Sequence, residues 1–153
     1  MEKTLLLIKP SAIQRGLIGE VISRLEKKGL RIAGMKMMVM SEDLIKEHYA
    51  HLLDKPFFPK IKKSMTASPL IALCLDGVGA VDVVRKLTGV TNGREALPGT
   101  IRGDFSSSIS ENIVHTSDSL ENAGIEVARF FKQEEIFEYR PVALDFIFAG
   151  DEL

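Results

Sequence analysis

The most constraining feature of the sequence is the alternation of short apolar runs with segments of helical periodicity. The clearest apolar run, Leu70–Leu75, is preceded by Pro69 and followed by Asp76-Gly77. Short apolar runs bounded by such residues are typical of buried strands, whereas apolar residues spaced three or four apart are typical of helices. The order of these elements along the chain therefore limits the folds that it can adopt.

Taken in order, the pattern predicts four strands, at 4–8, 31–40, 70–75 and 113–115. Helices are expected between them and after the last strand, at 11–29, 41–52, 60–65, 80–87 and 117–131, with Ser11 and Ser41 as N-caps. This order favours an α+β fold, the ferredoxin-like split βαβ sandwich, in which helices cover a four-stranded antiparallel sheet. Without repeats or linkers, residues 1–153 are expected to form a single domain, ending in a tail from about residue 140.

Residues 88–110 form a long loop with neither periodicity, and groups suited to phosphate gather around it. Arg85 precedes the loop, and Thr91 and Arg102 lie within it among several glycines. A guanidinium group holds phosphate oxygens by paired hydrogen bonds, and glycines let backbone N–H groups approach closely. Long loops are often functional, but this spacing fits a solvated loop with surface arginines equally well.

Two polar residues lie at the ends of predicted strands, where side chains can project over the edge of a sheet. Lys9 follows the first strand and His115 ends the fourth. Imidazole is a capable nucleophile near neutral pH. From position alone, however, a snorkelling lysine and an ordinary core or surface histidine remain open alternatives.

The composition narrows the class of protein and its partners. With 45% hydrophobic and 27% charged residues the chain is typical of a globular protein. A net charge of −1 argues against a stable nucleic-acid partner, because duplex binding requires many cations. No apolar stretch approaches the roughly 20 residues of a membrane span, and no secretory signal is evident, so a cytoplasmic protein is expected.

Three further groups of residues are given structural roles. Cys74 lies inside an apolar run and is predicted to be a core residue rather than a reactive thiol. His48 and His51 lie three apart without a third ligand nearby in the sequence, so a zinc site is not expected. The methionine cluster is expected to fill the core: Met35, Met37, Met38 and Met40.

The segment Asn112–Asp118, Asn-Ile-Val-His-Thr-Ser-Asp, closely resembles the active-site segment of nucleoside diphosphate kinases. Other segments resemble the family in its order and at its separations: Lys9-Pro10, Gln14–Glu20, Glu47–Tyr49, Pro56–Phe58 and Pro98–Phe105. The similarity extends to about Tyr139. It implies the ferredoxin-like fold and an enzyme that moves the γ-phosphate of a nucleoside triphosphate to a nucleoside diphosphate.

The resemblance also implies a ping-pong mechanism through a phosphohistidine. His115 would attack the γ-phosphate and hold it until a nucleoside diphosphate takes it from the same site. Glu126 would hydrogen-bond the other imidazole nitrogen and fix the tautomer, and Tyr49 and Ser117 would pack around the ring.

The nucleotide would be held along a row of implied contacts. The phosphates would bind Lys9, Arg85, Thr91 and Arg102. Lys9 and Asn112 would reach the ribose hydroxyls, and Mg²⁺ would ride on the phosphates with Asp118 touching its water shell.

Phe57 would stack on the base, with Ile109 on its other face. Stacking accepts every base, since each has a π-face, so broad base specificity is expected. The resemblance further implies a homo-oligomer, with a hexamer favoured and a tetramer as the alternative.

Five positions depart from the family pattern: Ser11, Gly93, Ser110, Glu111 and Thr116. Thr116 stands where Gly or Ala is usual and can crowd the pocket. Glu111 replaces a commonly basic residue and can weaken attraction for the nucleotide. Gly93 replaces a proline, which is expected to cost about 0.4–1 kcal/mol of stability if the geometry suits proline.

Two other functions remain open at this stage. An RNA-recognition module on the same fold would need exposed aromatic strands, which Leu70–Leu75 does not supply. A degenerate kinase kept as a scaffold is suggested by Thr116 and Glu111. The retained lysine, arginines, asparagine and histidine argue against it.

Overall fold

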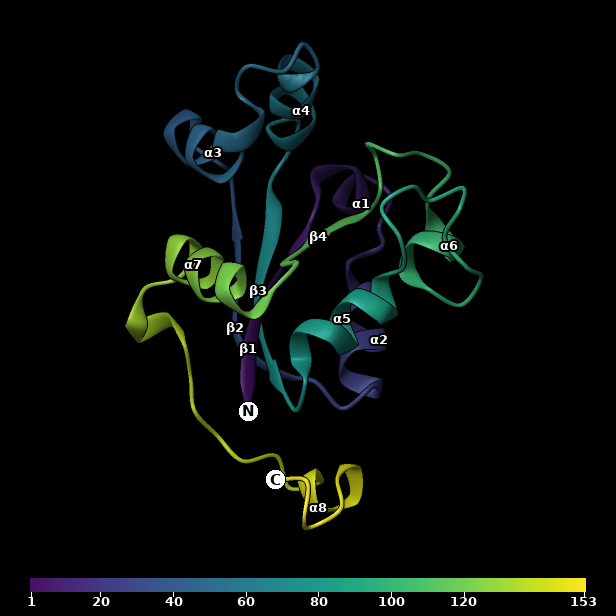
Figure 1. Cartoon of the computed structure of the whole chain (residues 1–153), viewed down its shortest axis with the longest axis vertical. Helices are drawn as coiled ribbons and strands as arrows, with labels where there is room; N and C mark the ends of the chain where they lie inside the picture. Colours follow the sequence, from purple (N-terminus) through teal and green to yellow (C-terminus); the bar gives the residue numbers. More distant parts are fainter.

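A four-stranded sheet forms the centre of the molecule in the computed structural model, which describes residues 1–153 (Figure 1). The strand order is β2-β3-β1-β4, with bounds Glu2–Ile8 (β1), Arg31–Met38 (β2), Leu70–Gly77 (β3) and Val114–Thr116 (β4). Every neighbouring pair is antiparallel. The predicted ferredoxin-like arrangement is therefore confirmed.

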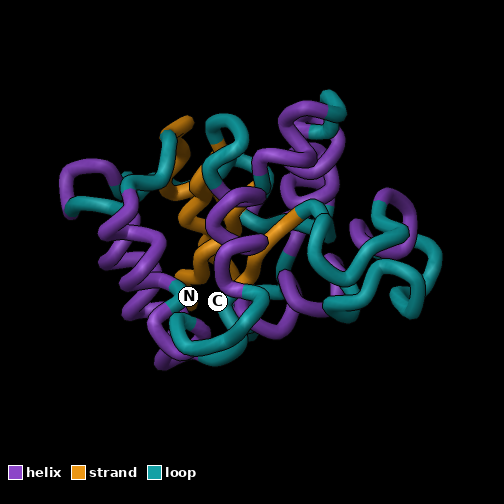
Figure 2. The backbone as a smooth tube through the Cα atoms, turned by 90° about the horizontal axis from the view of Figure 1, so that it is seen from above, coloured by secondary structure: helices purple, strands orange, loops and turns teal.

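Helices cover both faces of the sheet, as Figures 1 and 2 show from two directions. Their bounds are Pro10–Gln14 (α1), Ile18–Lys27 (α2), Glu42–His48 (α3), Phe58–Met65 (α4), Ala80–Thr88 (α5), Ile101–Phe105 (α6), Leu120–Phe130 (α7) and Leu144–Ile147 (α8). Short 3-10 turns occupy Ala50–Leu52 and Gln133–Glu135. Helices α2 and α5 pack on one face, and α3, α4 and α7 pack on the other.

The central strand β1 explains why its sequence is a continuous apolar run. Leu6 and Ile8 join the core on the side of α2 and α5, while Leu5 and Leu7 join the core on the side of α7. Successive side chains of a strand point to opposite faces, and both faces are covered here. Each fully buried leucine contributes about 1.5–3 kcal/mol, so this strand is a firm anchor for Lys9, which follows its C-terminal end, and for the paired β4.

The prediction of one continuous helix at 11–29 is wrong, both in where the helix starts and in its being unbroken. It is two helices, separated at Gly16, whose φ is +68°. Lys9 rather than Ser11 occupies the N-cap of α1, and the Ser11 hydroxyl is buried without a partner. Pro10 explains this start, because proline suits the first helical position, where its missing N–H costs nothing. The second predicted cap is confirmed, since Ser41 Oγ accepts from Leu44 N at 3.1 Å.

Two short helices were not predicted, and one prediction for the core fails in part. Helix α6 lies inside the long loop, and α8 lies in the tail, where it buries Leu144. Met35 and Met37 are more than half exposed on β2, an edge strand, so the core prediction is wrong for them. It is confirmed for Met40, and the separate prediction that Cys74 is a core residue is confirmed as well, because Cys74 is fully buried.

Gly93 does not occupy a position suited to proline. Its N–H donates to Ser108 O at 3.1 Å, and a Cβ there would overlap Ser106 Oγ. Proline would lose the hydrogen bond and clash with Ser106. The condition attached to the expected loss of stability, a geometry that suits proline, is therefore not met.

None of the helices has the length and apolar character needed to cross a membrane.

Candidate active site

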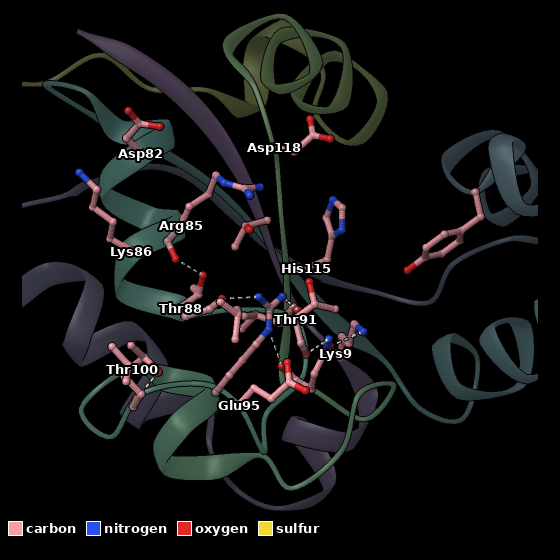
Figure 3. A pocket seen from close by; sticks show the side chains of 18 residues that line it. Lys9, Asp82, Arg85, Lys86, Thr88, Thr91, Glu95, Thr100, His115 and Asp118 are labelled. Atoms are coloured by element: carbon pink, nitrogen blue, oxygen red, sulfur yellow. Dashed lines mark hydrogen bonds between the residues drawn. The ribbon is translucent and has the colours of Figure 1, made fainter.

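Two adjoining cavities bring most of the predicted site residues together. The larger, about 790 Å³, opens between α5, the start of the long loop and β4 (Figure 3). The second, about 550 Å³, continues between α4 and residues 109–112. The first is lined by Arg85, Arg102, His115 and Asp118, the second by Phe57 and Ile109, and both by Lys9, Tyr49, Thr91 and Asn112. Glu126 and Ser117 lie behind His115 rather than in the cavity walls.

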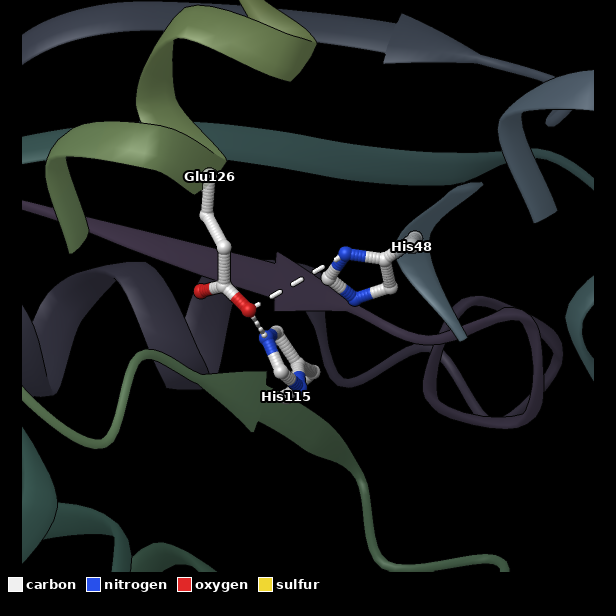
Figure 4. Close-up of side chains that lie close together, drawn as sticks. All are labelled: His48, His115 and Glu126. Carbon is white, nitrogen blue, oxygen red and sulfur yellow. Dashed lines mark hydrogen bonds and ion pairs between the residues drawn. The ribbon is translucent and has the colours of Figure 1, made fainter. Parts of the chain in front are cut away.

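His115 is held by a carboxylate on α7. Its Nε2 lies 3.0 Å from Glu126 Oε1, and Ser117 Oγ donates to Glu126 Oε2 at 2.5 Å (Figure 4). Burial alone would raise the pKa of Glu126, but the hydrogen bonds from His115 and Ser117 lower it to about 2. The carboxylate is therefore ionised and accepts from Nε2–H, which leaves the lone pair on Nδ1, the nitrogen that faces away from Glu126.

A second histidine, not predicted as a site residue, lies against this pair. The side chain of His48 is buried, its Nδ1 is 4.0 Å from Glu126 Oε1, and its ring centroid is 4.6 Å from that of His115. Arg129 NH1 lies 3.2 Å from His48 Nδ1 and donates to it. His51 is exposed and does not join the cluster.

The backbone before His115 makes a tight, strained turn. Ile113 has φ +74°, and Val114 N donates to Asn112 O at 2.8 Å, so the three residues form a γ-turn. A β-branched residue with positive φ is a genuine outlier. Lys9 N donates to Ile113 O at 2.9 Å, which places Lys9 beside the turn.

Arg102 fastens the long loop to this turn. Its guanidinium donates to Asn112 O at 3.2 Å, Gly89 O at 2.8 Å and Val114 O at 2.8 Å. Burial, together with the nearby charge of Arg85, lowers the pKa of Arg102 to about 10. Three of its five N–H groups are occupied, which leaves its charge and two donors for a ligand.

Lys9 and Asn112 form a polar pair where the two cavities meet. Lys9 Nζ donates to Asn112 Oδ1 at 2.7 Å and to Ser110 O at 3.2 Å. Asn112 Nδ2 in turn donates to the carbonyls of Thr91 and Ile109, each at 3.0 Å. Burial, with a contribution from Arg102, lowers the pKa of Lys9 to about 8.

The remaining charged residues lie on the cavity rim. Arg85 is exposed and extends from α5 toward β4 (Figure 3). Asp118 is also exposed, and its Oδ1 accepts from Asn122 Nδ2 at 2.6 Å. Thr116, the departure expected to crowd the pocket, lines the same cavity and is half-buried.

The second cavity is more open. Phe57 on its α4 side is 44% exposed and Ile109 on its loop side is 56% exposed. Ser110 and Glu111 are exposed at its edge. A flat apolar group of a ligand could lie against these walls, with its anionic end among Lys9, Arg85 and Arg102.

Comparisons with known proteins place the chain in one family. The family profile described as "Nucleoside diphosphate kinase" matches residues 2–136. A nucleoside diphosphate kinase of Parabacteroides distasonis is 58% identical over 152 residues, covering 99% of each chain. Nucleoside diphosphate kinase B of Bos taurus is 46% identical over 147 residues, covering 96% of this chain and 97% of its own.

A solved structure is similar over nearly the whole fold. It is a halophilic nucleoside diphosphate kinase from Halobacterium salinarum in complex with CDP, with a TM-score of 0.93 and 39% identity. The match covers 96% of this chain and 98% of that one. The chain therefore belongs to the nucleoside diphosphate kinase family.

Proposed function

We propose that this chain transfers the γ-phosphate of a nucleoside triphosphate to a nucleoside diphosphate through a phosphorylated His115. One observation carries the proposal: Nε2 of His115 is tied to Glu126 at 3.0 Å, which leaves Nδ1 as the nucleophile in a cavity with several cations. A nucleophile oriented by a second group, which a third group supports, is the usual arrangement for covalent catalysis.

The first half-reaction makes one bond and breaks one. The lone pair of His115 Nδ1 attacks the γ-phosphorus, and the bond from that phosphorus to the β,γ-bridging oxygen breaks. The nucleoside diphosphate leaves with the bonding electrons. Nε2 keeps its proton, which it donates in a hydrogen bond to Glu126. The negative charge of Glu126 balances the positive phosphoimidazole ring. In the second half-reaction a terminal oxygen of the acceptor attacks the phosphorus, and the lone pair returns to Nδ1.

Phosphate binding falls to the cations and polar groups around the first cavity. The guanidinium of Arg85 lines the cavity and makes no hydrogen bond or ion pair within the chain, so it is free to meet equatorial phosphate oxygens. Lys9 and Arg102 lie deeper, where their charges are less screened, and Thr91 offers a hydroxyl at the rim. In phosphoryl transfer, positioning and cationic stabilisation do most of the work, so this set suits the reaction.

Magnesium would accompany the phosphates rather than bind in a protein cage. The carboxylates of this cavity, Asp82, Glu95 and Asp118, lie at its exposed rim, and Mg²⁺ commonly keeps waters and uses few carboxylates. With Oδ1 held by Asn122, Asp118 can offer Oδ2 to a water of the ion. The ion would supply positive charge to the phosphate oxygens.

The base would lie between Phe57 and Ile109, and the ribose would lie near Lys9 and Asn112. Tyr49 and Ser117 would keep the imidazole packed in place. The enzyme would act in the cytoplasm as a homo-oligomer, a hexamer rather than a tetramer. The exposed Met35 and Met37 on the edge strand β2, and the exposed Val39 directly after it, support association, and sedimentation velocity would measure its stoichiometry.

The decisive experiment incubates the purified protein with γ-labelled ATP and magnesium, then analyses it under denaturing conditions. The wild type should carry acid-labile, base-stable label, which added GDP should discharge. His115→Asn should carry none, and His51→Asn, at an exposed histidine, should label normally. A folded wild-type protein that binds nucleotide but takes no label would instead support an inactive scaffold.

A further inference from the structure

A buried histidine beside the reaction centre has no part in the function proposed above. His48 lies at the end of α3, and its ring stands at 81° to that of His115 with centroids 4.6 Å apart. Tyr49 and Phe130 also pack against it edge to face, at 4.8 and 5.2 Å. Such aromatic contacts have a specific geometry, so the ring of His48 is fixed on several sides.

Hydrogen bonding defines the protonation state of His48. A guanidinium group can only donate, so Nδ1 accepts from Arg129 NH1 and the single ring proton lies on Nε2. Arg129 is itself held by Glu47 Oε1 at 3.1 Å. Burial and the neighbouring His115 lower the pKa of His48 to about 3, in agreement with a neutral ring.

This state keeps Glu126 available to His115. Glu126 Oε1 is 3.0 Å from His115 Nε2 and 4.0 Å from His48 Nδ1. Because Nδ1 of His48 carries no proton, it cannot donate to the carboxylate and compete with His115. The same three side chains offer donor atoms within 4.8 Å of one another, as a metal site would. The positive charge of Arg129 at His48 Nδ1 works against a cation there.

His115 needs a second restraint besides Glu126. The outer torsion of a histidine side chain is broad, and one hydrogen bond at Nε2 restrains only one point of the ring. A ring packed at right angles against it limits rocking of the imidazole plane. We propose that His48 is a positioning residue, whose neutral buried ring holds the His115 imidazole with Nδ1 directed at the γ-phosphate. The inference rests on the proposed function, because it assigns a support to the same nucleophile.

Two substitutions at His48 test whether an aromatic ring at this position is what restrains His115. His48→Ala removes the ring, whereas His48→Phe keeps an aromatic edge against His115 without the acceptor for Arg129. His51→Ala, at an exposed histidine on the neighbouring turn, is the matched control. Single-turnover labelling with γ-labelled ATP at several concentrations gives the maximal rate and the half-saturating concentration separately, and thermal melting reports folding.

We expect His48→Ala to slow maximal labelling at least about tenfold, since small misplacements of a reacting group are costly. Its half-saturating ATP concentration should stay within about twofold of the wild type, because the phosphate contacts are intact. His48→Phe should recover labelling to within about threefold of the wild type, and His51→Ala should match the wild type.

Three results would overturn the inference: a folded His48→Ala that labels at the wild-type rate, a His48→Phe as slow as His48→Ala, or a slower rate explained by weaker ATP binding. If His48→Ala does not fold, His48→Phe decides alone, with a loss of about tenfold counting against the ring. A wild-type protein that takes no label would contradict the proposed function itself, whereas a labelled wild type with unaffected variants would contradict only the role of His48.

Discussion

The two ends of the site differ in how firmly they are built. At the phosphate end, His115, Glu126 and Ser117 are tied to one another and largely buried between β4 and α7. At the base end, Phe57 and Ile109 are about half exposed, at 44% and 56%. The difference suggests that order is concentrated where one atom must be placed, whereas the base end stays open enough to receive different bases.

The largest expected effect comes from breaking the ordered end. Glu126→Ala should lower kcat by about 10²–10³-fold, because His115 loses the acceptor that fixes its tautomer and balances its charge. The concentration of ATP at half-maximal rate should change little. Steady-state kinetics checks this, with Glu121→Ala, an exposed acid on the same helix, as the control. A loss of kcat below about fivefold would mean that His115 reacts almost as well without the hydrogen bond to Glu126, against the comparison of the two ends.

The long loop between the two ends is expected to be as tightly packed as the ordered end. Gly93→Pro should destabilise the fold by about 2–4 kcal/mol, since it removes a hydrogen bond and forces a ring against Ser106. Urea unfolding measures the change. Gly19→Ala, which has open space around its new methyl group, should not destabilise the protein. If Gly93→Pro were more stable than the wild type, the long loop would be loosely packed, like the base end of the site.

Lys9 stands where the two ends meet, and its charge should link the site to pH. Its pKa is lowered from 10.5 to about 8, so the folded state releases its proton first as pH rises. Nucleotide affinity should therefore fall above pH 8, by up to about tenfold per pH unit. Folding stability should change in the opposite direction. Between about pH 8 and 10.5 the unfolded state binds more protons at Lys9 than the folded state does, so the free energy of unfolding should rise with pH in this range.

Calorimetric titration of ADP at pH 7 and pH 9 measures the affinity, with Lys9→Met as the control that should lose most of the pH dependence. Urea unfolding at the same two pH values measures the stability. Affinity that stays constant from pH 7 to 9 in the wild type would contradict the assignment of Lys9 to the phosphates.

The smallest effect is expected at the open end. Phe57→Ala should raise the half-saturating nucleotide concentration about fivefold, the lower range for loss of a stacked base, because the ring is already half exposed. The increase should be similar for all four bases, and kcat should be nearly unchanged. A hundredfold preference of the wild type for one base in kcat/KM would break the comparison, since an open end cannot discriminate so strongly.

The central strands could be predicted from sequence because of how they are buried. β1 and β3 are covered on both faces, so they are continuous apolar runs that stand out from their surroundings. The five-residue α6 is too short to show periodicity, and only the Thr100 cap, which accepts from Gly103 N at 3.0 Å, marks its start. The fold, the family and the assignment as an enzyme are confirmed, and the single-domain prediction stays a prediction.

The site could be predicted less fully from the residues themselves. Lys9 and His115 were ambiguous from position, and the family resemblance supplied their roles, which stay predictions. No site role for His48 is predicted from the sequence, although its place three residues after the buried Ile45 on a helix is typical of an inward-facing side chain. Its contact with His115 joins residues far apart in the chain, which spacing cannot reveal.

The turn at Ile113 limits how this sequence can change. The residue combines a positive φ, which suits glycine, with a fully buried side chain, which glycine lacks. Glycine would relieve backbone strain of about 1–3 kcal/mol and leave a cavity costing a comparable amount. Asparagine, which tolerates this backbone, would bury an amide among apolar neighbours. Each of these two replacements thus exchanges one penalty for another, so neither of the residues that best tolerate this backbone conformation improves on isoleucine at position 113.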